Sequence, residues 1–232
     1  HRHRRLRLHL PDTSRYGEVF GAFYETFQPC VESRLVTTIA CDTYVREVER
    51  YGGEAIEPTE RLFGCDSACI IRILELLRQQ GQFGTYPSEE IRWRLGLLLN
   101  DDLLDAFGLS LTEKTALVTE AAKGYKAEFG FTAHRSTKQI NDKYRALRDD
   151  LRHVMTTGLR EEFPREILEE RKRRIEGLAV TIKTMVPDGE LQDYLRSLIH
   201  MTMNRLFRSQ NRLCEMMVLE YLVREYNRFC HL

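Results

Sequence analysis

The chain has 232 residues, and its 35 acidic and 35 basic side chains give a formal net charge of zero. This length suits one large domain with a substantial core, and the charge balance argues against wholesale binding to nucleic acids or anionic membranes. No apolar run approaches the roughly 20 residues that span a bilayer, and no secretory signal opens the chain. The six cysteines lack the spacing of zinc ligands. We therefore expect a cytoplasmic protein without a metal site.

Two early segments predict β-strands. From Arg5 to Leu10, basic and leucine side chains alternate, and a period of two is typical of a half-buried strand. Residues 35–41 form the second expected strand because they are rich in β-branched side chains. Arg5 and Arg7 would lie side by side on one face, where two guanidinium groups suit a carboxylate. An exposed edge strand protected by charge, or a basic arm for nucleic acid, explains the same pattern.

The rest of the chain predicts helices. Asp12 or Thr13 caps a first helix that runs to about Phe27, and Pro29 ends it. After the glycine pair, further helices are expected to open near Glu57, Asp66, Pro87, Thr112, Ser136, Pro164, Glu190 and Asn211. Because strands come early and helices follow, we predict an α+β fold, with an N-terminal sheet packed against a helical C-terminal two-thirds. We expect one domain over residues 1–232, strand-rich in 1–56 and helical in 57–232, that lacks its N-terminal portion.

Residues 42–53 concentrate charged and aromatic side chains before a Gly-Gly turn. Glycine pairs allow a close backbone approach, so they place neighbouring side chains in a cleft. Glu47 and Arg50 are three residues apart and share one face of a helical turn, between Tyr44 and Tyr51. The segment is therefore a candidate site. A solvated connector with incidental ion pairs is the alternative.

The expected helix from Glu190 carries a second candidate. One face forms a core stripe of leucines, and another forms a polar ridge at intervals of four residues: Arg196, His200, Asn204 and Arg208. Ser197 lies one turn before His200. An imidazole on a polar ridge can exchange protons near neutral pH, although a surface histidine without a function has the same pattern.

Three motifs together resemble the glutamate-elimination domain of class I lantibiotic dehydratases, which also occurs as a small free-standing protein in lanthipeptide and thiopeptide pathways. The first is His-x-Arg-x-Arg at residues 3–7, where Arg4 replaces the apolar residue that is usual in the family. The second is Tyr-x-x-Glu-x-x-Arg-Tyr-Gly-Gly at 44–53, followed by Phe-x-x-Asp-Ser at 63–67. The third is Ser-x-x-His-Met-x-x-Asn-Arg-Leu at 197–206. Their order and spacing extend over nearly the whole chain.

The resemblance implies a β-elimination that leaves dehydroalanine or dehydrobutyrine. A partner enzyme or domain uses glutamyl-tRNA to esterify Ser and Thr side chains of a ribosomal precursor peptide, and the elimination domain removes glutamate. Carried over by motif, the catalytic residues are His200, Arg7, Arg50 and Glu47. The substrate-binding residues are Arg5, Ser197, Asn204, Tyr44 and Tyr51. His200 is the first choice for proton transfer, Glu47 for orienting its neighbours, and the arginines for gripping glutamate. Which group is the base stays open.

The resemblance also implies partners and rivals. The expected partners are a leader-containing precursor peptide and the glutamylating enzyme or domain. No cofactor, membrane or direct contact with nucleic acid is expected. A homodimer is compatible with the sequence. The nearest rival activity is that of thiopeptide pyridine synthases, which join two dehydroalanines and release the leader. The second rival is a non-catalytic module that binds the precursor peptide. The glutamate-handling residues favour elimination.

Overall fold

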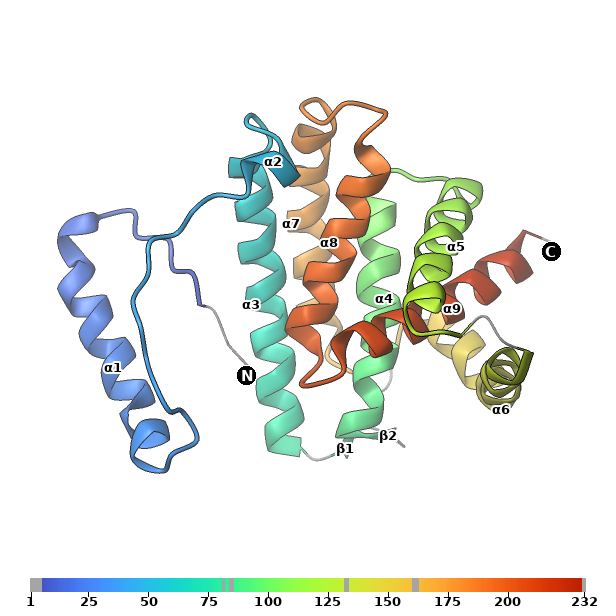
Figure 1. Cartoon of the computed structure of the whole chain (residues 1–232), viewed down its shortest axis with the longest axis horizontal. Helices are drawn as coiled ribbons and strands as arrows, with labels where there is room; N and C mark the ends of the chain where they lie inside the picture. Colours follow the sequence, from blue (N-terminus) through green and yellow to red (C-terminus); the bar gives the residue numbers. More distant parts are fainter. Residues whose placement is uncertain (1–5, 81, 84–85, 132–133, 160–162, 231–232) are drawn as a thin grey trace. The chain divides into compact units, whose positions relative to one another are not determined.

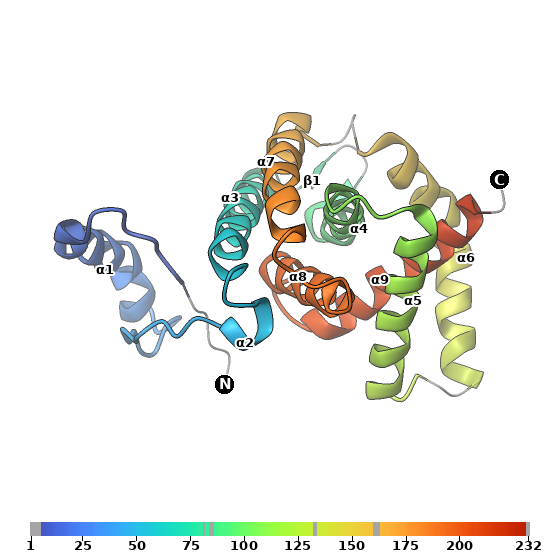
Figure 2. The ribbon, with the colours of Figure 1, turned by 90° about the horizontal axis from the view of Figure 1, so that it is seen from above.

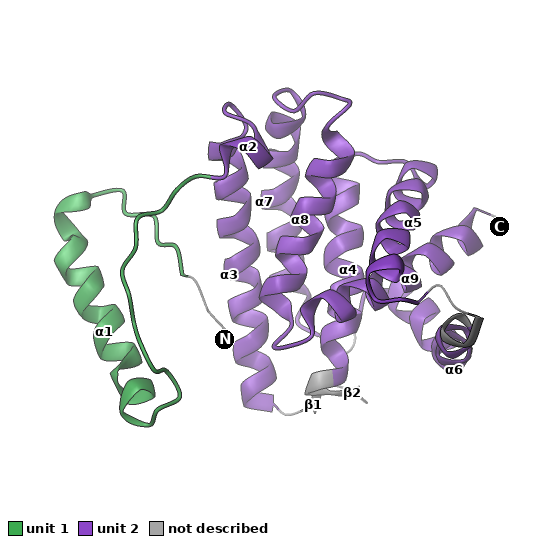
Figure 3. Ribbon diagram, in the orientation of Figure 1, with its two compact units in different colours: residues 1–46 green, residues 47–232 purple. Residues whose placement is uncertain are grey.

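The computed structural model describes residues 6–80, 82–83, 86–131, 134–159 and 163–230. The chain divides into two compact units, residues 1–46 and residues 47–232 (Figure 3). We call them unit 1 and unit 2 and describe each by itself. The expectation of a single domain stays a prediction.

Among the described residues the secondary structure is almost entirely helical (Figure 1), and the predicted α+β fold is wrong. The described part of the first expected strand, residues 6–10, and the whole second one, 35–41, have no strand structure. In the described chain, strands occur only in a short antiparallel pair, β1 (Gln82–Phe83) and β2 (Tyr86–Pro87). Alternation and β-branched side chains permit a strand, but its backbone groups also need a partner strand, and neither segment has one among these residues.

Unit 1 contains a 3-10 turn, η1 (Thr13–Arg15), and one helix, α1 (Tyr16–Glu32). Asp12 caps the turn as expected, because its carboxylate accepts the Ser14 N–H at 2.9 Å. The helix does not end at Pro29. Proline removes only its own N–H from the hydrogen-bond pattern, and Ser33 N–H still donates to the Pro29 carbonyl at 3.0 Å.

Unit 2 is a helical bundle, seen from above in Figure 2. Its helices are α2 (Val48–Tyr51), α3 (Ile56–Gln80), α4 (Ser88–Ala106), α5 (Leu111–Glu128), α6 (His134–Thr157), α7 (Arg165–Lys183), α8 (Leu191–Leu206) and α9 (Asn211–Phe229). The expected helix starts agree with these bounds except in α3, where two expected helices are one. No helix in the described part of the chain is both long and apolar enough to cross a membrane.

Helix α4 lies at the centre of the bundle and contacts α3, α6, α7, α8 and α9 (Figure 2). Its side chains from Ile91 onward are buried on nearly all faces, as expected of a helix that neighbours surround. Gly96 allows the close approach of two of these neighbours. A Cβ atom there would lie 3.4 Å from side-chain atoms of Met203 on α8 and Val218 on α9.

Asp66 joins three helices from the bundle interior, which corrects the expectation that a new helix begins near this residue. The carboxylate is fully buried in α3 and accepts hydrogen bonds from Arg171 Nε at 2.8 Å and Thr202 Oγ1 at 3.1 Å. Arg205 Nη1 contributes a third bond at 3.2 Å. Because a buried carboxylate needs such partners, α3 continues through Asp66 and packs on α7 and α8.

Candidate active site

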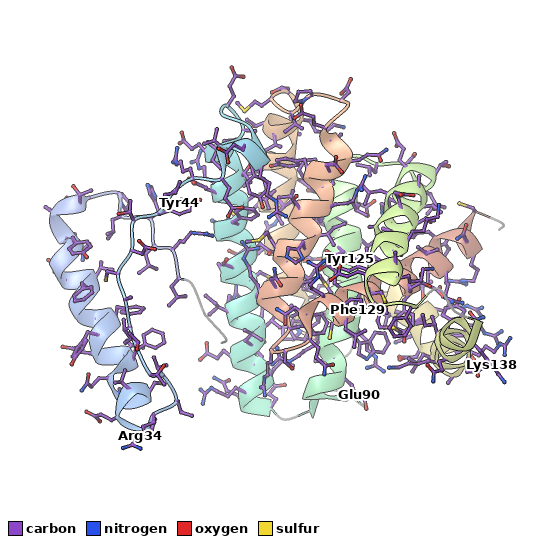
Figure 4. The ribbon with its side chains drawn as sticks, in the orientation of Figure 1. Arg34, Tyr44, Glu90, Tyr125, Phe129 and Lys138 are labelled. Carbon is purple, nitrogen blue, oxygen red and sulfur yellow. The ribbon has the colours of Figure 1, made fainter. Side chains whose placement is uncertain are left out.

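Unit 2 contains a cavity of about 670 Å³ whose wall comes from α2, α5, α8 and α9. Helix α8 supplies Ser197 and His200, and the short helix α2 supplies Arg50. Tyr125 reaches it from α5 (Figure 4) and Glu215 from α9. Residues that are far apart in the sequence therefore surround one hollow.

His200 is held by a buried carboxylate. Its Nδ1 lies 2.8 Å from Glu215 Oε2, and the Glu215 side chain is only 2% exposed against 22% for the imidazole. A buried carboxylate must accept hydrogen bonds, so Glu215 favours the tautomer that carries its proton on Nδ1. The arrangement orients the ring and leaves the other nitrogen as a hydrogen-bond acceptor.

That second nitrogen is contacted by an amide chain. Asn211 Nδ2 donates to Asn204 Oδ1 at 3.2 Å, which turns the amide nitrogen of Asn204 toward the imidazole. Asn204 Nδ2 lies 2.8 Å from His200 Nε2. With Nδ1 facing Glu215, Nε2 is the nitrogen whose lone pair can take up a proton once a substrate displaces the amide.

Tyr125 completes the immediate surroundings of the imidazole. Its hydroxyl lies 3.4 Å from His200 Nδ1, and the Arg212 guanidinium stands 5.1 Å from its ring centroid. Burial, followed by the nearby charge of Glu215, raises the pKa of Tyr125 far above its ordinary value. Tyr125 therefore stays a neutral phenol that can donate a hydrogen bond at any physiological pH.

Arginines are the cations of the cavity wall. Arg50 Nε donates to Ser197 Oγ at 3.0 Å, and its Nη1 lies 3.6 Å from a carboxylate oxygen of Glu47. Arg212 binds Glu128 through two nitrogens, and these hydrogen bonds hold the pKa of Glu128 below its usual value. Both ion pairs are about half exposed. Because exposed ion pairs contribute little to stability, an anionic substrate can replace Glu47 or Glu128 at small cost.

The predicted site residues fall into both units. Ser197, His200 and Arg50 line the cavity, with Asn204 hydrogen-bonded to His200 and Glu47 beside Arg50. Tyr51 is buried instead, with its ring edge-on to the rings of Phe63 and Tyr194.

The unit 1 residues form a contact of their own. The guanidinium carbon of Arg7 lies 4.6 Å from the ring centroid of Tyr44. Arg5 lies outside the described residues. That Arg5, Arg7 and Tyr44 serve the same site as His200 stays a prediction.

Sequence reasoning missed Glu215 and Tyr125. A signal for Glu215 was present, because Leu219 and Leu222 follow it at intervals of four and seven residues on the buried stripe of α9. A carboxylate within an apolar stripe indicates a buried acid with a partner. No comparable signal existed for Tyr125, since an aromatic residue in a helix is most simply explained as core.

No group of three or more His, Cys, Asp or Glu side chains that could hold a metal ion occurs within the described part of the chain. Among known families, the model described as lantibiotic biosynthesis dehydratase C-term matches residues 1–226. The matched range includes unit 1, nearly all of unit 2 and all the predicted site residues. No curated protein and no solved structure matches the chain.

Proposed function

The chain belongs to the family of lantibiotic dehydratase C-terminal domains, and on this premise we propose that it removes glutamate from glutamylated Ser and Thr residues by β-elimination. The family gives it a role in the dehydration of a ribosomally made precursor peptide during lantibiotic-type biosynthesis. In our proposal a separate enzyme or domain first attaches glutamate through an ester to the Ser or Thr oxygen. This chain then forms dehydroalanine or dehydrobutyrine.

The proposed reaction begins with proton transfer to His200. Nε2 takes the α-proton of the esterified residue, and the electron pair of that C–H bond forms the Cα=Cβ double bond. The Cβ–O bond breaks, and glutamate leaves as a carboxylate. The Glu215 carboxylate, 2.8 Å from Nδ1, stabilises the positive charge that develops on the imidazole.

Arginines have two tasks in this proposal. One is to stabilise the negative charge that develops on the peptide carbonyl as the α-proton leaves, and the other is to hold the carboxylates of glutamate. Arg50 is placed for either task, since it lies on the cavity wall with Ser197 and His200. The observation that supports the proposal most strongly is this shared cavity, where an imidazole backed by a buried carboxylate shares one wall with a guanidinium.

The test follows the mass of a chemically glutamylated Ser/Thr peptide that carries its leader. Incubation with the protein should release free glutamate and leave a dehydrated residue. His200→Ala should fold normally and let the glutamylated peptide persist. His153→Ala is the matched control, since this histidine lies on α6 and is not among the residues of the cavity wall.

Three other outcomes contradict the proposal. Elimination by His200→Ala at the wild-type rate would remove His200 from the reaction. A leader-free macrocycle formed from a dehydroalanine peptide would identify a pyridine synthase instead. Binding of the precursor without any change in its mass would identify a non-catalytic module.

A further inference from the structure

Helix α9 has a hollow on each of two faces. One face carries Arg212, Glu215 and Leu219 and borders the cavity described above. Leu213, Met217 and Tyr221 lie on the other face and border a second hollow of about 370 Å³, between α9, α4 and α6. We call this second hollow the α9 groove. The two hollows share no described lining residue, so the groove is a separate site.

The floor of the α9 groove is aromatic and apolar. The rings of Trp93 and Tyr221 pack edge to face with their centroids 5.8 Å apart. The Arg94 guanidinium stands 4.2 Å from the centroid of the Trp93 ring and fixes its position. Trp93, Leu213 and Met217 are only partly buried, so their apolar surface is available to a ligand.

The charged side chains among the described residues that line the α9 groove are all basic. Its lining includes Arg92, Lys143 and Arg208, and none of its described lining residues is acidic. Arg92 is 3% exposed and is held in place by its hydrogen bond to the Leu206 carbonyl at 2.7 Å. The cavity beside His200, on the other face of α9, differs in charge because its wall contains several carboxylates as well as arginines. The α9 groove therefore complements a ligand that is both apolar and anionic.

We propose that the α9 groove binds a short acidic segment of the precursor peptide, in which carboxylates flank a large apolar side chain. The apolar side chain would contact Trp93 and Met217, and a carboxylate would pair with Lys143. A segment docked there keeps the rest of the same peptide near His200, which raises its effective concentration at the cavity. The identity of the occupant rests on the proposed function, whereas the preference for an acidic apolar ligand does not.

Trp93 makes the test direct, because the chain contains one tryptophan and it lies in this groove. The probe is a synthetic hexapeptide, acetyl-Gly-Asp-Leu-Phe-Glu-Leu-amide, with the Asn/Gln version as its neutral counterpart. Titration with the acidic peptide should change the tryptophan emission in a saturable way. The neutral peptide should bind about tenfold more weakly, which corresponds to the loss of roughly 1.4 kcal/mol.

A charge-reversing substitution distinguishes binding in the α9 groove from binding elsewhere on the surface. Lys143→Glu should weaken binding of the acidic peptide about tenfold and improve binding of a peptide with lysines at the acidic positions. Lys138→Glu is the matched control, because Lys138 is exposed on the same helix α6 and is not among the residues lining the groove (Figure 4). It should bind the acidic peptide as the wild type does.

The binding assay is independent of elimination, so the two proposals can fail separately. Equal affinity for acidic and neutral peptides, an unresponsive Trp93, or equal effects of Lys143→Glu and Lys138→Glu would overturn the groove proposal even if elimination occurs. Tighter binding of a single-stranded oligonucleotide than of the acidic peptide would overturn it as well. Selective peptide binding by a protein that releases no glutamate would support the groove and contradict the proposed elimination.

Discussion

Unit 1 and unit 2 both contain helices, but among the described residues only those of unit 2 form a buried core. No described residue of unit 1 is buried, and large apolar side chains of α1 such as Tyr16 and Tyr24 remain about half exposed. Helix α4 of unit 2 instead has Leu95, Leu99 and Leu103 fully buried. Each unit therefore contains helix, but only in unit 2 do described helices have the buried packing that supplies most helix stability.

Their ion pairs differ in the same way. Arg15 and Glu18 in unit 1 form a pair whose side chains are 64% and 68% exposed. Asp66 and Arg171 in unit 2 form a pair whose side chains are 0% and 1% exposed. Breaking an exposed pair changes little, but removing one member of a buried pair leaves a charge without compensation. The comparison therefore predicts which substitutions matter and which do not.

The largest effect is expected for Asp66→Asn. It leaves the buried Arg171 guanidinium without a counter-charge, so the free energy of unfolding should fall by about 3–5 kcal/mol. Glu18→Gln removes the acid of the exposed pair and should leave the urea midpoint unchanged. Urea unfolding followed by circular dichroism measures both variants. Similar midpoints for the two variants would refute the contrast between the units.

Glu215→Gln should act on the reaction more than on the fold. The amide keeps the shape of the side chain but loses the charge that stabilises the protonated imidazole, so the single-turnover elimination rate should fall about 10- to 100-fold. Glu225→Gln is the matched control, since Glu225 is also buried on α9 but pairs with Arg228. Equal rates for the two variants would show that Glu215 does not position His200.

Arg7→Lys tests whether unit 1 contributes to the reaction. A lysine keeps the charge but cannot make two parallel bonds to a carboxylate, so we expect an elimination rate about tenfold lower and an unchanged unfolding midpoint. Arg15→Lys, in the same unit, should match the wild type. An unaffected rate in Arg7→Lys would remove Arg7 from the glutamate-binding residues.

The smallest expected effect is a loss of stability of unit 2 at alkaline pH. Burial raises the pKa of Tyr194 and Tyr221 to about 12, from an ordinary value of 10.0. Between these two values the unfolded chain has lost protons that the native protein still holds, so stability falls as the pH rises. Urea midpoints at about pH 9 and about pH 11 should reveal a loss of about 1 kcal/mol per tyrosine. Tyr221→Phe should reduce that slope, and an unchanged slope would contradict the burial of this phenol.

Much of the helical structure was predictable from short-range patterns. Ser110 and Glu113 form a capping box at the start of α5, within two residues of the predicted start. His200 and Asn204 are four residues apart, so their contact follows from helical geometry alone. The failures occurred where a segment depends on distant partners, as in residues 35–41, whose β-branched pattern lacks a neighbouring strand among the described residues.

The candidate site also has parts that were predictable from the sequence and parts that were not. Its polar ridge on α8 and the Glu47–Arg50 turn were predictable, because each lies within one or two helical turns. The pairing of His200 with Glu215 was not, since it depends on how α9 packs against α8.

By itself, the sequence determined where most helices begin, which of their faces are apolar, and the family to which the chain belongs. Only the tertiary structure decided that Asp66 joins three helices instead of marking the start of one, and that Glu215 contacts the imidazole of His200. The physical reason is the distance along the chain over which each interaction acts. Caps and helical periodicity act over a few residues, whereas a buried charge is stabilised only by groups that the folded chain brings to it.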